Sequence, residues 1–323
     1  MDSLIAILVF LFGLALGSFL NVCIYRIPLV LPEEVPGQSP LHATFSAIGA
    51  WSAVYQPERS ICPRCGHTIR WYDNLPLASW VLLGGRCRDC AGRISPRYAA
   101  VELLTAALFL ASYLRFGLTW DTLKFSVLAF LLIGLIFTDA EHRLLPDAFT
   151  IPGTLLGLIF SVLVPVNDVV TLYFPSTFAL RHSWRLLSFV DALAGAVVGG
   201  GFIFGCGLAY KLARGREGMG LGDVKLMVLI GAFLGVKLTV LTIFGASILG
   251  SVFGLAMLPL VWVKRLRRRL RCNRESFARA RRRAWTSAKL VRYYAIPFGV
   301  FLGAVALLAV FKGNSFLRWY WSL

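Results

Sequence analysis

Eight apolar segments, separated by polar stretches, constrain the fold of this chain more than any other feature of its sequence. A helix that crosses the hydrocarbon core of a bilayer needs about 20 mostly apolar residues. The sixth segment is short, so it must either cross only part of the bilayer or sit tilted against its neighbours. We expect membrane spans at roughly 4–25, 98–116, 121–139, 147–166, 188–211, 224–235, 237–263 and 294–312.

The composition agrees with this interpretation and excludes a soluble globular protein. Of the 323 residues, 58% are hydrophobic and only 15% are charged, and the mean hydropathy is +0.72. A soluble domain carries about 25% charged residues. We therefore expect an all-α polytopic membrane protein with about eight transmembrane helices. The net charge of +17 is attributed to basic loops that face the anionic inner leaflet, with no nucleic-acid partner.

The distribution of basic residues predicts the orientation of the spans. If the stretch after the first span faces the cytoplasm, that side carries 26 Lys and Arg residues and the opposite side carries 7. The positive-inside rule then places both termini in the periplasm. The sequence divides into a first span (1–25), a cytoplasmic loop (26–97) and a seven-helix core (98–323), which contains a basic loop at 264–292. We interpret that basic loop as a topology anchor; the alternative is a helix lying on the inner leaflet.

Two CxxC motifs in the first cytoplasmic loop predict a small zinc-ribbon-like insert. The two motifs are separated by 21 residues, a spacing that suits one tetrahedral zinc ion with four thiolate ligands. Four thiolates leave no open coordination position, so the expected role of zinc is structural. A pair of redox-active CxxC motifs is the alternative, and His67 is expected at the surface. The predicted ligands are Cys62, Cys65, Cys87 and Cys90.

Two aspartates at span ends are the candidate catalytic groups. Asp139 ends the third span and Asp223 begins the sixth, so both lie at similar depth on the cytoplasmic side of the predicted topology. Two carboxylates in a site of low dielectric can share a proton, one activating water and the other binding the substrate carbonyl. The glycines before Asp223, at 218, 220 and 222, are expected to permit unusual backbone angles and a close approach of substrate.

The alternative for each membrane-edge acid is a structural role. Asp223 begins a helix, where Asp is a favoured cap, and Asp147 after Pro146 is expected to cap the fourth span. Glu102 and Asp191 are expected to be interhelical hydrogen-bond partners. The sequence contains no HExxH, GxSxG or phosphate-loop motif, so the zinc-protease, serine-hydrolase and nucleotide-binding classes receive no support.

The chain resembles the type IV prepilin peptidases, a family of bifunctional leader peptidase/N-methyltransferases of the bacterial inner membrane. The resemblance rests on Gly220-Leu-Gly222-Asp223-Val-Lys225 and on Asp139, six residues before Leu145-Pro146-Asp147. It also rests on the two CxxC motifs and on Gly17-Ser-Phe-Leu-Asn-Val-Cys. It implies an aspartyl peptidase of the GxGD type, with Asp139 and Asp223 as catalytic residues and Gly220, Gly222 and Lys225 as supporting motif residues.

The implied substrates are prepilins and pseudopilins, cut on the cytoplasmic side after a short basic leader. The resemblance also implies methylation of the new N-terminus with S-adenosyl-L-methionine, although no residue of the methyl-donor site can be identified from the sequence. The alternatives are a peptidase without methyl transfer and a zinc-ribbon membrane adaptor without catalysis. A proton-relaying transporter is a further alternative, but the inverted repeats typical of that class are not evident.

Overall fold

The computed structural model describes residues 2–30, 50–55, 60–166, 184–215, 220–272 and 297–322. Within these ranges the regular secondary structure is helical, apart from two isolated β-bridges that join Ile61 to Thr68 and Arg86 to Arg93. The long helices are α1 (Asp2–Val30), α4 (Pro96–Phe116), α5 (Trp120–His142), α8 (Trp184–Arg214), α9 (Leu221–Cys272) and a C-terminal helix made of α11 (Phe298–Leu308), η5 (Ala309–Gly313) and α12 (Asn314–Trp321).

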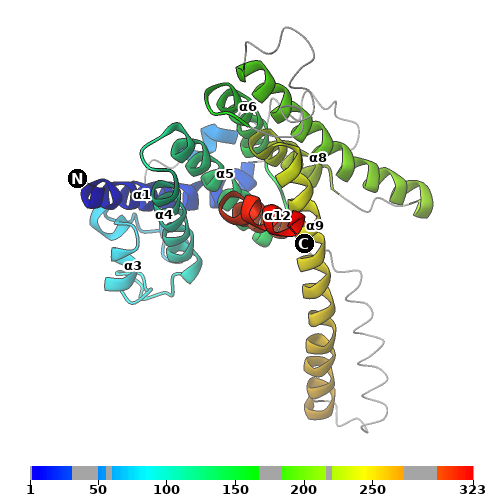
Figure 1. Ribbon diagram of the computed structural model, residues 1–323. Helices are drawn as coiled ribbons and strands as arrows, with labels where there is room; N and C mark the ends of the chain where they lie inside the picture. The colour runs from blue at the N-terminus through cyan, green and yellow to red at the C-terminus, as the bar shows by residue number, and fades with distance from the viewer. Residues whose placement is uncertain are drawn as a thin grey trace.

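The predicted membrane spans are confirmed as helices. Six helices of the described residues are long and apolar enough to cross a membrane, and the shorter α6 (Asp147–Leu163) is also apolar. Helix α5 lies at the centre of the bundle, where it packs against α1, α4, α6 and α11 (Figure 1). The protein is therefore a multi-pass, all-α membrane protein.

Helix α9 contains the sixth and seventh predicted spans, which are separated by a break at Gly235. Gly235 has φ 75° and ψ −176°, a conformation that is essentially restricted to glycine. Met227 before the break and Thr239 after it both lie against Gly199 of α8, so the chain folds back at Gly235. The first part of α9 is about 21 Å long and crosses only part of a bilayer. The end of α9 extends away from the other helices (Figure 1).

Small residues allow the closest helix contacts. A Cβ atom placed on Gly231 of α9 would lie 2.2 Å from the backbone oxygen of Gly195 on α8. A Cβ atom on Gly17 of α1 would lie 2.7 Å from the Cα of Glu102 on α4. Such contacts between backbones commonly hold helices together in membranes. Lipid tails are as apolar as the helix side chains, so the hydrophobic effect does not favour contact between helices there.

The segment between α1 and α4 contains three short helices, η1 (Ala50–Tyr55), η2 (Trp71–Asn74) and α3 (Ala78–Leu82). The indole Nε1 of Trp51 donates a hydrogen bond to the backbone oxygen of Ala148 at 3.2 Å. Arg26 of α1 donates to the backbone oxygen of Val54 at 2.7 Å. These contacts fix η1 between the end of α1 and the start of α6. Of the predicted basic loop 264–292, the part after Cys272 lies outside the described residues.

Candidate active site

Asp139 lies in the last turn of α5, and only 6% of its surface is exposed. Its Oδ2 accepts a hydrogen bond from the backbone N–H of Val300 at 3.1 Å. Val300 is the third residue of α11, so the carboxylate lies at the N-terminus of that helix, where unpaired N–H groups favour an acceptor. A Cβ atom placed on Gly299 would lie 2.8 Å from the same Oδ2, so only glycine leaves room for this contact.

Asp223 is the third residue of α9 and is half-buried. Asp139 lies near enough to Asp223 for its charge to act on that carboxyl group. Leu145 packs against Gly222, which precedes Asp223, and against Gly299, which contacts Asp139. A Cβ atom on Gly222 would be 3.0 Å from Leu145 Cβ, and one on Gly299 would be 3.2 Å from Leu145 Cδ1. The structure thus gathers both candidate aspartates around Leu145, and their catalytic role stays a prediction.

Lys225 and Asp147 form an ion pair beside this site. The Nζ of Lys225 lies 2.7 Å from Oδ1 and 2.6 Å from Oδ2 of Asp147. The expectation that Asp147 caps α6 is wrong, because Pro146 occupies the cap position and no side chain caps the helix. The carboxylate of Asp147 is mostly buried, and the ammonium group of Lys225 stabilises its charge better than one backbone N–H of α6 would. The pair joins the starts of α6 and α9.

The glycines of the GxGD motif act differently from the expectation. Neither Gly220 nor Gly222 has a positive φ, so unusual backbone angles do not explain them, and Gly218 lies outside the described residues. Gly222 instead provides the close approach to Leu145. Among the described residues, no heavy atom outside the motif lies within 4 Å of a Cβ atom placed on Gly220.

A second ion pair, which sequence reasoning missed, joins the start of α4 to the end of α5. Arg97 forms a salt bridge with Glu141, two residues after Asp139. The guanidinium of Arg97 also lies 4.6 Å from the ring centre of Tyr98. No local motif indicates this pair, because its partners are 44 residues apart.

The four predicted zinc ligands come together in the insert. The sulfur atoms of Cys62, Cys65, Cys87 and Cys90 all lie within 4.8 Å of one another, and those of Cys62 and Cys90 are 3.9 Å apart. Sulfurs bound at about 2.3 Å around a tetrahedral zinc ion are separated by about 3.8 Å, so this donor set fits one such ion. His67 is exposed and does not belong to the group, in agreement with the expectation.

The two CxxC turns have matching backbones. The N–H of Cys62 donates to the oxygen of His67, and the N–H of Cys87 donates to the oxygen of Gly92, both at 2.9 Å. Gly66 and Ala91, the residues after each second cysteine, both have positive φ. The insert is thus two equivalent knuckles that face each other, as a zinc ribbon requires.

The thiols of the first knuckle differ in acidity. The backbone amides of Cys65 and Arg64 lower the pKa of the Cys62 thiol to about 7, which favours the thiolate that binds metal. The amide of His67 lowers the pKa of Cys65, but burial and bonds to neighbouring thiols outweigh it and raise that pKa to about 11. Four thiols this close favour a bound cation, which would allow all of them to ionise.

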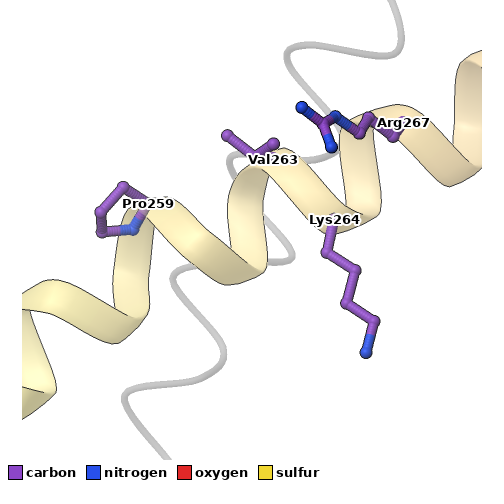
Figure 2. A pocket seen from close by; sticks show the side chains of 4 residues that line it. All are labelled: Pro259, Val263, Lys264 and Arg267. Atoms are coloured by element: carbon purple, nitrogen blue, oxygen red, sulfur yellow. The ribbon is translucent and has the colours of Figure 1, made fainter.

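An open cavity of about 360 Å³ lies on the last part of α9 (Figure 2). Its described walls are Pro259, Val263, Lys264 and Arg267 of one helix, and Lys264 points to the other side of the helix from Val263 and Arg267 (Figure 2). None of these four residues is acidic, and none belongs to the candidate active site.

Two family models match the chain. The bacterial Peptidase A24 N-terminal domain matches residues 11–116, and the type IV leader peptidase family matches residues 126–255. The first match covers the insert and the second includes both candidate aspartates. No solved structure matches the chain.

Curated relatives resemble nearly the whole chain. A prepilin leader peptidase/N-methyltransferase from Aeromonas salmonicida is 35% identical over 98% of this chain and 93% of the relative. Proteins of the same name from Aeromonas hydrophila and Pseudomonas aeruginosa are 34% and 33% identical, over 97% and 96% of this chain and 92% and 91% of the relatives. Since the similarity runs from the insert through the aspartate-bearing helices, the chain belongs to the type IV leader peptidase family.

Proposed function

We propose that this protein is a membrane aspartyl endopeptidase that removes leader peptides from prepilins or pseudopilins and then methylates the new N-terminal residue. The observation that supports the proposal is the position of Leu145, which packs against Gly222, the neighbour of Asp223, and against Gly299, which contacts Asp139. The names of the curated relatives support the substrate class and the second activity.

In the proposed cleavage, Asp139 and Asp223 share one proton and hold a water molecule. The ionised carboxylate takes a proton from this water as its oxygen attacks the scissile carbonyl carbon, while the protonated one donates a hydrogen bond to the carbonyl oxygen. The tetrahedral intermediate collapses when a proton passes to the leaving nitrogen and the C–N bond breaks. No covalent enzyme intermediate forms. The hydrogen bond from Val300 to Asp139 keeps one carboxylate in position throughout.

Zinc has a structural role in this proposal. The four thiolates would complete its tetrahedral coordination, so no position remains for water or substrate. The ion would close the two knuckles of the insert against each other. Peptide cleavage is therefore expected to proceed without it.

The methyl transfer rests on family membership. S-adenosyl-L-methionine supplies an activated methyl group on a positively charged sulfur. The described residues of the cavity along α9 include Lys264 and Arg267, and they give no evidence of a methyl-donor site. We therefore assign no residue to the methyl-donor site.

The proposed orientation places the active site at the cytoplasmic face of the bacterial inner membrane, with both termini in the periplasm. The excess of Lys and Arg residues, 26 to 7, supports it. The position of the insert and of both aspartates at the same end of the bundle is consistent with it. The division of the chain at residues 25 and 97 stays a prediction.

The decisive experiment uses purified protein in nanodiscs with a prepilin peptide that carries its leader. Asp139→Asn and Asp223→Asn are each expected to abolish cleavage while the protein remains inserted. Both variants should still methylate a pilin peptide that has already been cut. Full cleavage by either variant would refute the aspartate pair. Cleavage without methylation by the natural protein would reduce the function to that of a peptidase alone.

A further inference from the structure

The insert exposes a cluster of large apolar side chains. Trp71 is 80% exposed, Val81 62% and Leu82 84%, and Leu75 beside them is 47% exposed. These four residues, the apolar patch, belong to η2, α3 and the turn between them. An apolar cluster of this kind on a water-facing loop signals an interaction surface.

A hydrogen bond fixes the depth of this segment relative to the membrane. The backbone N–H of Leu77 donates to Oε2 of Glu102 on α4 at 2.7 Å. Helix α4 has 21 residues, so it is about 31 Å long and matches the hydrocarbon core of about 30 Å. Glu102 lies about 9 Å beyond Pro96 along this helix and packs at Gly17, near the middle of α1. With α4 spanning the hydrocarbon core over its full length, Leu77 would lie close to the depth of Glu102, below the membrane surface.

Several backbone groups of the segment are hydrogen-bonded within the protein. Leu77, with φ 59° and ψ −47°, makes the tight turn between η2 and α3, and its N–H is bonded to the carboxylate of Glu102. Beyond this turn the N–H groups of Ser79 and Val81 donate to the oxygens of Leu75 and Leu77. A segment that enters lipid must satisfy its backbone groups in this way. The arrangement also explains why α4 carries a buried acid.

Charges of the right sign flank the apolar patch. Arg88 is bonded to Asp73 and lies 5.6 Å from the ring centre of Tyr72. Anionic head groups attract basic side chains that lie at the edge of a bilayer. The exposed arginines of the insert are Arg64, Arg70, Arg86, Arg88 and Arg93.

We propose that residues 71–83 form a re-entrant element that enters the lipid leaflet on the insert side, with the apolar patch in the acyl chains and the arginines among the head groups. Glu102 holds its tip against α4. The zinc knuckles would then stand at the membrane surface, with their position fixed relative to α1 and α4. This inference does not depend on the enzymatic activity.

The test places a photoreactive benzophenone amino acid at Leu82 of the full-length protein in phosphatidylethanolamine–phosphatidylglycerol vesicles. Illumination is expected to give lipid adducts by mass spectrometry, as it should at Leu103, an exposed residue of α4. The matched control is Asp89, exposed on the second knuckle, which should give none. An absence of lipid adducts at Leu82, or a crosslink to a second protein in their place, would overturn the proposal.

A second measurement tests the role of Glu102. Glu102→Gln keeps an acceptor oxygen and should retain the lipid adducts at Leu82, whereas Glu102→Ala should lose them. Independently of these variants, brominated lipids should quench part of the tryptophan fluorescence of the natural protein, and Trp71→Phe should reduce the quenched part; Trp120, Trp184 and Trp319 on the membrane helices account for the rest. An unchanged quenched fraction in Trp71→Phe would contradict insertion of the patch.

Discussion

Replacement of Gly299 by alanine should disable the proposed peptidase without unfolding the protein. The added methyl group would lie 2.8 Å from Oδ2 and 3.3 Å from Cγ of Asp139, whereas ordinary contacts begin at 3.4 Å. The carboxylate must therefore move by about 0.6 Å, or α11 must shift by a similar distance. Either movement disturbs the 3.1 Å hydrogen bond from Val300. Since a displacement near 1 Å can lower a rate about 100-fold, we expect kcat to fall about 10- to 100-fold.

The assay is the initial rate of cleavage of a prepilin peptide in nanodiscs, with kcat and KM determined separately. KM should change little, because the displaced group acts on the bond that breaks. Gly250→Ala is the matched control: its methyl group would meet the rings of Phe298 and Phe301 at an ordinary 3.8 Å, so its activity should be unchanged. An unaltered kcat in Gly299→Ala, or an equal loss in both variants, would refute the proposed placement of Asp139.

Three further predictions concern the supports of the site. Asp147→Asn should destabilise the start of α9 by about 1 kcal/mol and lower kcat, because it removes the partner of Lys225. The double variant Asp147→Lys with Lys225→Asp should restore part of the activity. No recovery in the double variant would argue against a positioning role of the ion pair. Cys62→Ser should release zinc, measured by metal analysis, while cleavage continues; loss of cleavage in a protein that stays folded would contradict the structural role of zinc. Gly231→Ala should lower the free energy of unfolding by about 3 kcal/mol in denaturation experiments, because its methyl group would lie 2.2 Å from the oxygen of Gly195. Gly201→Ala, whose methyl group would face open space, should leave the free energy of unfolding unchanged.

The features that could be predicted from the sequence are those encoded locally. Each membrane span follows from the cost of placing polar groups in lipid, which acts on every segment separately. The four-cysteine group follows from short loops that bring pairs of sulfurs to one ion. The break in α9 was also foreseen, because a short apolar segment was recognised before Gly235, the residue that takes the glycine-only conformation.

The features that were missed depend on tertiary contacts. Val300 and Asp139 are 161 residues apart, and nothing near either residue indicates the other. The rule that Asp caps a helix failed at Asp147, because Lys225 offers a full positive charge from 78 residues away. Two expectations were stated for Gly222. The unusual backbone angle is absent, and the close approach is made by Leu145 of the same chain.

The convergence of helix starts explains how a bundle of helices can act on an extended peptide. Helices α6, α9 and α11 all begin near Leu145, and the first N–H groups of a helix have no partner within it. A substrate helix that unwinds in the membrane loses backbone hydrogen bonds, each worth several kcal/mol in lipid. We propose that the helix starts around Leu145 offer donors for the freed carbonyl groups. Glycines at 222 and 299 keep side chains out of the way there, so the helix starts can lie close to Leu145 and to Asp139.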